Sequence, residues 1–140
     1  MRIKILVNIE KKNKTPDFFI DGYDEYLKRL SRFAKLNLIF FKEEEQVYKH
    51  LNNRQKIFVL NDLKDTISSE EFSDIMYKTS VQSNIYNEVI FIISDLKLKD
   101  IDCLDFTLSK SKLSTEMTLL ILLEQIYRGY KIMNRENYHK

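Results

Sequence analysis

The sequence predicts an α/β fold built on a mostly parallel β-sheet. Segments with strand and helix patterns alternate along the chain. Two of them, residues 57–60 and 89–93, are continuous apolar runs of the kind found in strands that are covered on both faces. A helical pattern separates these runs, and a strand–helix–strand unit of roughly thirty residues is typical of parallel strands joined by a right-handed crossover.

The first half of the chain begins with a short strand at residues 3–8, followed by a lysine-rich loop. A helix start follows, with Thr15 as the N-cap, Pro16 at the first helical position and Asp17 in the first turn. Apolar residues at helical spacing carry this helix to about Arg32. A second strand is expected at residues 36–41 and a short helix at residues 43–51.

The second half continues the alternation. After the strand at 57–60, Ser68 or Ser69 caps a helix that has glutamates in its first turn. Its predicted buried stripe consists of Phe72, Ile75, Met76 and Thr79. The strand at 89–93 is followed by a weaker strand at about 104–108, a polar loop and a final helix at about 115–133.

Composition limits the possible classes of protein. The chain has 140 residues, of which 44% are hydrophobic and 31% charged, and this predicts one globular domain over residues 1–140. No apolar stretch reaches the roughly 18–20 residues that span a bilayer. The single cysteine, Cys103, suits a reducing cytoplasm and is expected to be a small buried filler. The net charge of +2 does not by itself indicate nucleic-acid binding.

The final helix is apolar on every side. Residues 119–123 are four leucines and one isoleucine in a continuous run, and Ile126, Tyr127 and Tyr130 extend the apolar surface. A helix of this kind must be covered all round. We therefore expect a homodimer in which a second chain covers the side away from the sheet, with complete covering inside one chain as the alternative.

The chain ends in Tyr138, His139 and Lys140, a ring, an imidazole and an ammonium group. Chain termini usually fray unless contacts hold them. The cluster is therefore either an ordered tail packed on a partner subunit or part of a functional site.

Two segments resemble the ribosomal large-subunit methyltransferase H family of the SPOUT superfamily of trefoil-knotted methyltransferases. Near the start, Gly22-Tyr23 and the Glu25-Tyr26 pair precede Lys28-Arg29 in a helix after a lysine-rich loop. At the end, residues 123–133 read Leu-Glu-Gln-Ile-Tyr-Arg-Gly-Tyr-Lys-Ile-Met and are followed by the terminal Tyr-His-Lys. The order of elements agrees with the family over essentially the whole chain.

The resemblance implies a SPOUT-type α/β knot, with a knot region at about 57–133, and a homodimer whose active site is completed across the interface. It implies methyl transfer from S-adenosylmethionine to N3 of a pseudouridine in 23S rRNA of the large ribosomal subunit, within the assembled ribosome. The implied cofactor contacts are Leu60, Ser94 and the knot loop Leu108, Ser109, Lys110, Ser111, Lys112 and Leu113.

The chemistry of methyl transfer narrows the roles of the remaining candidates. A sulfonium donor needs no metal, but one proton must leave the nucleophile. We assign His139 or solvent as the base, and Tyr138 and Arg128 as groups that position the base or a phosphate. His50 falls on the distant short helix. For Arg128 the alternative is a structural ion pair, for example with Glu124, and Lys110 and Lys112 have the alternative of plain solvated lysines.

The chain departs from the family pattern at two loops. The family's glycine-rich turn is replaced by Ser94-Asp95 and the residues after it. The family's Pro-His and following Arg are replaced by Ser114-Thr115 and Leu119. These departures define an alternative function, a knotted dimer that binds RNA or ribosome without methyl transfer.

Overall fold

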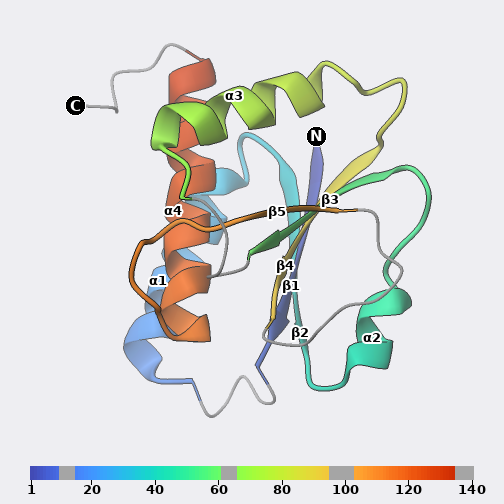
Figure 1. Cartoon of the computed structure of the whole chain (residues 1–140). Helices are drawn as coiled ribbons and strands as arrows, with labels where there is room; N and C mark the ends of the chain where they lie inside the picture. Colours follow the sequence, from blue (N-terminus) through green and yellow to red (C-terminus); the bar gives the residue numbers. More distant parts are fainter. Residues whose placement is uncertain (10–14, 61–65, 95–102, 135–140) are drawn as a thin grey trace.

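The computed structural model describes residues 1–9, 15–60, 66–94 and 103–134. Strands and helices alternate along the chain as the sequence predicts (Figure 1). In order the elements are β1 (Arg2–Asn8), α1 (Asp17–Leu30), β2 (Lys35–Phe41), α2 (Glu44–Tyr48), β3 (Gln55–Leu60), α3 (Ser69–Ser80), β4 (Glu88–Ile93), β5 (Leu104–Phe106) and α4 (Thr115–Met133).

The five described strands form one sheet in the order β2-β1-β4-β3-β5. Every pair of neighbouring strands is parallel, which confirms the predicted sheet. In the β3–α3–β4 unit the two strands are direct neighbours, with Gln55 beside Glu88 and Leu60 beside Ile93. All carboxyl ends therefore lie at one edge of the sheet and all amino ends at the other.

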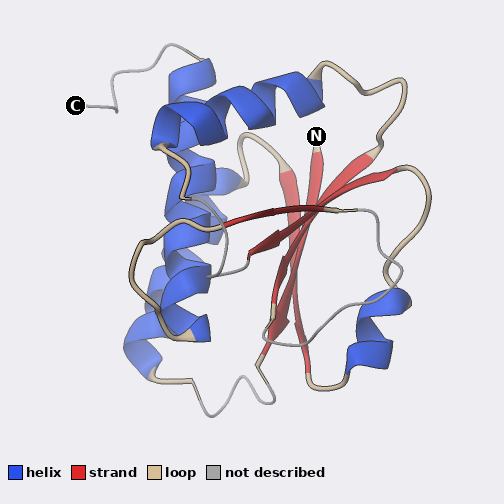
Figure 2. Ribbon diagram, in the orientation of Figure 1, coloured by secondary structure: helices blue, strands red, loops and turns tan. Residues whose placement is uncertain are grey.

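Two apolar layers lie on opposite faces of this sheet. On one face α1, α3 and α4 cover alternate strand residues such as Ile5, Phe58 and Phe91 (Figure 2). On the other face the short helix α2 places Val47 against a smaller cluster. Cys103 packs against that smaller cluster but is only half-buried, so it is less enclosed than expected.

The start of α1 differs from the prediction by one residue. Pro16, not Thr15, is the N-cap, because its ψ of 143° is extended and the first helical residue is Asp17. No side chain of the described residues caps this end of the helix, and the Thr15 side chain is buried. By contrast, Ser68 caps α3 as predicted, in a capping box with Glu71.

Helix α4 is covered largely within its own chain. Its residues Leu119, Leu122 and Leu123 have no exposed surface, because α1 and α3 flank the helix and the sheet lies beneath it. Ile121 and Ile132 are half-buried and belong to neither core cluster. Most of the surface of α4 that we expected a second chain to cover is thus covered by the same chain. The homodimer stays a prediction and needs a separate argument. No helix in the described ranges is both long and apolar enough to cross a membrane.

Two buried tyrosines make the free energy of unfolding depend on pH in the alkaline range. Burial raises the pKa of Tyr130 from 10.0 to about 12, and burial also raises the pKa of Tyr23, whose hydroxyl donates to the Glu116 carbonyl at 2.8 Å. Above pH 10 the unfolded chain loses these protons while the folded chain keeps them. The contribution of these two tyrosines to the free energy of unfolding is therefore fully present below pH 10. It is lost progressively as pH rises from 10 towards 12.

We expect Tyr130→Phe to make this decline shallower. Urea unfolding at pH 8, 10 and 11.5, conditions chosen to bracket a phenol pKa of about 10, measures the effect. Tyr77→Phe is the matched control, since the Tyr77 side chain is 55% exposed. Equal pH slopes for the two variants and the wild type would contradict the expectation.

Candidate active site

Three segments of the predicted site meet at the carboxyl edge of the sheet. The register of β3 places Leu60 beside Ile93 of β4 on one side and beside Phe106 of β5 on the other. Ser94 follows Ile93 directly, and residues 107–113 follow β5. The structure therefore brings Leu60, Ser94 and the start of the loop together, at the edge where parallel α/β sheets bind their ligands.

The loop after β5 is tied down at its beginning. Thr107 forms a parallel bridge with Thr66, and the backbone N–H of Ile67 donates to the Thr107 carbonyl at 3.2 Å. The Thr107 hydroxyl donates to the Ser109 carbonyl at 3.2 Å, and the backbone N–H of Ser111 donates to the Ser109 hydroxyl at 3.1 Å. These bonds hold the backbone of the loop in a defined turn beside residues 66 and 67, which precede α3.

The side chains of this loop divide into an apolar base and a polar rim. Leu60 is buried, and Leu108 is half-buried and packs against the main core. Ser109 and Leu113 are half-buried, whereas Lys110, Ser111 and Lys112 are exposed.

These residues fit S-adenosylmethionine in chemical type. The apolar base suits an adenine ring, and the hydroxyl and ammonium groups of the rim suit the polar methionine end of the molecule. Among the described residues no three His, Cys, Asp or Glu side chains are grouped as metal ligands would be.

Ser114 has a structural role at one of the two places where the chain departs from the family pattern. It is the N-cap of α4, and its side chain accepts a hydrogen bond from the Met117 N–H at 3.2 Å. The Thr118 hydroxyl donates to the Ser114 carbonyl at 2.9 Å. Serine at this position therefore begins the last helix, a role for which serine is well suited.

Arg128 connects α4 to α3. One terminal nitrogen of its guanidinium lies 2.9 Å from Glu124 Oε1, and the other donates to the Ser69 hydroxyl at 3.1 Å. The ion pair with Glu124 confirms the structural alternative that the sequence left open. A contact with substrate stays a prediction for Arg128, whose side chain is 32% exposed.

Sequence reasoning missed two contacts that position Arg128. Ser69, considered only as a possible helix cap, accepts the hydrogen bond from Arg128. One turn further along α3, the Ser73 hydroxyl donates to the Gly129 carbonyl at 3.3 Å. A Cβ on Gly129 would lie 3.8 Å from the Ser73 Cα, so the two helices approach closely at this point. Gly129 itself was the available signal, because the chain has only two glycines.

Tyr138 and His139 lie outside the described residues. Their attachment point is nevertheless defined, because α4 ends at Met133. The helix of 19 residues is about 28 Å long at about 1.5 Å per residue. It begins beside the loop after β5 and ends at the far side of α3 (Figure 1). The predicted cofactor loop therefore precedes the start of α4, and the predicted catalytic tail is attached to its other end.

Comparison with known proteins agrees with this architecture. Residues 1–139 match the family described as "Predicted SPOUT methyltransferase". The chain is 36% identical to the ribosomal RNA large subunit methyltransferase H of Dictyoglomus thermophilum, over 99% of both proteins. It is 32% identical to the enzyme of the same name from Mesoplasma florum, over 100% of both. With the enzyme of the same name from Clostridium botulinum it shares 32% identity, over 88% of this chain and 91% of that protein. The chain belongs to the SPOUT methyltransferase family and, within it, to the ribosomal RNA large subunit methyltransferase H family.

Proposed function

We propose that this protein methylates N3 of a pseudouridine in 23S rRNA, with S-adenosylmethionine as the methyl donor. The observation that carries the proposal is the meeting of Leu60, Ser94 and the 107–113 loop at the carboxyl edge of the sheet. Membership of a family of rRNA methyltransferases supports the reaction and the class of substrate.

The length of α4 supports a homodimer with an active site shared between subunits. His139 is the fifth residue after Asn134, the C-cap of α4. A fully extended chain of five residues spans at most about 18 Å, whereas α4 is about 28 Å long. His139 thus cannot reach the loop residues next to the start of its own α4. A site that holds both needs the tail of a second chain.

The proposed roles follow from the chemistry of the nucleophile. The cofactor, when bound, supplies a methyl group on a sulfonium. The pseudouridine N3 would bond to the methyl carbon as the carbon–sulfur bond breaks and its electron pair stays on sulfur. His139 or solvent would accept the proton that N3 loses. Tyr138 and Arg128 position the base or a neighbouring phosphate. Leu60 and Leu108 would exclude water from the apolar side of the cofactor, and Lys110 and Lys112 would hold its carboxylate.

Calorimetric titration with S-adenosylmethionine tests the cofactor site. We expect binding by the wild-type protein and at least about a 10-fold weaker affinity for Ser109→Tyr, because a ring added at a half-buried position fills space at the carboxyl edge. Ser83→Tyr makes the same change at an exposed position in the connection between α3 and β4, at the amino edge, and should bind like the wild type.

The second candidate function is a knotted dimer that binds RNA or ribosome without methyl transfer. It is favoured by serine at the two altered loops, because Ser94 follows β4 where the family has a glycine-rich turn and Ser114 is engaged as a helix cap. Absence of S-adenosylmethionine binding by folded wild-type protein in the same titration would reject the catalytic proposal and leave this one.

A further inference from the structure

One segment concentrates positive charge that the net charge of the whole chain conceals. Residues 26–42 contain three lysines and two arginines and no aspartate or glutamate, although the chain carries a net charge of only +2. This stretch covers the last five residues of α1 and all of β2. Lys28, Arg29, Arg32 and Lys35 are all exposed.

Aromatic rings from α1 and α4 support these cations. The guanidinium carbon of Arg29 lies 5.5 Å from the centroid of the Tyr26 ring and 5.8 Å from that of Tyr127. Arg32 lies 4.2 Å from the centroid of the Phe33 ring, and Lys131 Nζ lies 5.9 Å from that of Tyr127. We call Lys28, Arg29, Arg32, Lys35 and Lys131 the basic surface.

The rings themselves form a packed base under the basic surface. Phe33 stacks on Tyr130, with ring centroids 5.2 Å apart and planes inclined by 7°. Tyr127 meets Tyr26 and Phe33 edge-on, at 6.0 and 6.1 Å. Arg29 is held further by Glu25, whose Oε1 accepts from Arg29 Nε at 2.9 Å. Side chains fixed in this way lose less conformational freedom when they bind a phosphate.

The helix dipole of α1 explains only some of the cations in the basic surface. Lys28 and Arg29 lie in the last turn of α1, where cations interact favourably with the helix dipole. Arg32 and Lys35, however, lie beyond the end of the helix at Leu30. Lys35 also lines a groove of about 690 Å³ between α1 and the free edge of β2, together with Leu27, Ser31 and Ala34. The charge thus continues onto a concave surface.

The basic surface lies at the same end of the molecule as the start of the C-terminal tail. Lys35 begins β2 at the amino edge of the sheet, beside Arg2 of β1. Lys131 lies in the last turn of α4. In a dimer whose tail enters the active site of the partner, the basic surface would therefore flank that site.

We propose that the basic surface binds the phosphate backbone of the substrate RNA next to the methylated base. This inference rests on the proposed rRNA methyltransferase function and assigns the surface that holds the RNA. Exposed cations that alternate with aromatic rings suit RNA, because phosphates pair with the cations and unstacked bases pack on rings. The groove extends the path of the RNA from α1 to the edge of β2.

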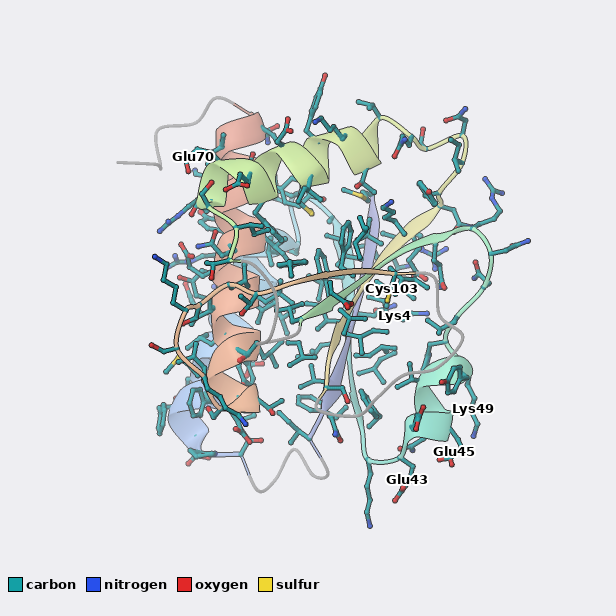
Figure 3. The ribbon with its side chains drawn as sticks, viewed as in Figure 1. Lys4, Glu43, Glu45, Lys49, Glu70 and Cys103 are labelled. Atoms are coloured by element: carbon teal, nitrogen blue, oxygen red, sulfur yellow. The ribbon has the colours of Figure 1, made fainter. Side chains whose placement is uncertain are left out.

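A triple variant tests the proposal. Lys28→Ala, Arg32→Ala and Lys35→Ala remove three exposed cations of the basic surface. The control variant combines Lys49→Ala, Arg54→Ala and Lys78→Ala, which changes the charge equally at exposed positions of other elements. Lys49 lies at the end of α2, well away from α1 and α4 (Figure 3).

The measurement is binding of labelled, protein-free 23S rRNA at several salt concentrations. We expect the test variant to bind about 10- to 100-fold more weakly than the control near 0.1 M salt. The slope of log affinity against log salt should become shallower by about 2 to 3, because each lost phosphate contact removes roughly 0.7 to 0.9 from it. S-adenosylmethionine binding and the unfolding midpoint should equal those of the control.

Two outcomes would overturn the assignment. Equal RNA affinity and salt slope for the two triple variants would exclude the basic surface from RNA binding. Weaker binding of the test variant to ribosomes, with unchanged binding to protein-free rRNA, would show instead that the surface contacts a ribosomal protein. Failure of the proposed function is distinguishable from both, because the wild-type protein would then fail to methylate ribosomes.

Discussion

Replacement of His139 by alanine is expected to lower the rate of rRNA methylation by about 100-fold or more. A positioned general base contributes about two to four orders of magnitude to a rate, and solvent would have to replace it. The pseudouridine N3 proton must leave for the nitrogen to accept the methyl group. The measurement is single-turnover transfer of a radiolabelled methyl group to ribosomes that lack the modification.

The matched control is His50→Ala. It removes the other histidine of the chain, which follows α2 on the face of the sheet away from α4. The backbone carbonyl of His50 accepts a hydrogen bond from Gln55 Nε2 at 2.9 Å. This variant should methylate at the wild-type rate. The sedimentation coefficient and cofactor affinity of the His139 variant should match those of the wild type. Unchanged turnover would remove His139 from the mechanism.

Mixing a variant of the tail with a variant of the cofactor loop tests whether the active site is shared between subunits. Purified His139→Ala has an intact cofactor loop, and Ser109→Tyr has an intact tail. After exchange of subunits, half of the dimers contain one chain of each variant. Each of these mixed dimers has one complete active site out of two. We therefore expect about one quarter of the wild-type activity from a twofold-symmetric dimer. A mixture as inactive as its components would show that each chain builds its site alone.

Replacement of Leu123 by alanine is expected to lower the free energy of unfolding by about 2 to 5 kcal/mol, the range for buried leucines whose neighbours relax only partly. Leu123 has no exposed surface and lies in the core beneath α4. Helix α1, helix α3 and the sheet all pack against α4, so several elements would have to move to fill the cavity. Urea unfolding followed by circular dichroism gives the difference.

Leu104→Ala is the matched control because it makes the same chemical change where 52% of the side chain is exposed. We expect it to cost no more than about 1 kcal/mol. Similar losses for the two variants would contradict the intramolecular covering of α4. If Leu123→Ala does not express in folded form, Leu123→Ile preserves the volume and should still cost measurably more than Leu104→Ile.

The regular elements could be predicted because their signals are local. Apolar residues at helical spacing and a serine with glutamate three residues later predict α3, and the capping box of Ser68 and Glu71 is present. The final helix was predicted with its observed bounds, Thr115–Met133. The prediction failed at Thr15, because a proline with extended ψ moved the N-cap to Pro16. Sequence gives little information about which of two adjacent residues has the non-helical backbone.

The candidate site could be predicted only in part. Leu60 and Ser94 are predicted through a family resemblance. The strand register adds that Leu60 lies between Ile93, which precedes Ser94, and Phe106, which precedes the loop after β5. The hydrogen bond from Arg128 to Ser69 joins residues 59 positions apart. No sequence pattern reports a contact over that distance, because it depends on how α3 and α4 cross.

The sequence alone determined the α/β class, the parallel sheet and the family, since these follow from local periodicity and from motifs read along the chain. Only the tertiary structure decided that α4 is covered mainly by α1, α3 and the sheet of its own chain. Only the tertiary structure brings Arg29, Arg32 and Lys131 close to the packed rings of Tyr26, Phe33 and Tyr127. The physical reason is that burial and charge proximity depend on which surfaces of distant helices face each other, and helix packing decides that only when the whole chain has folded.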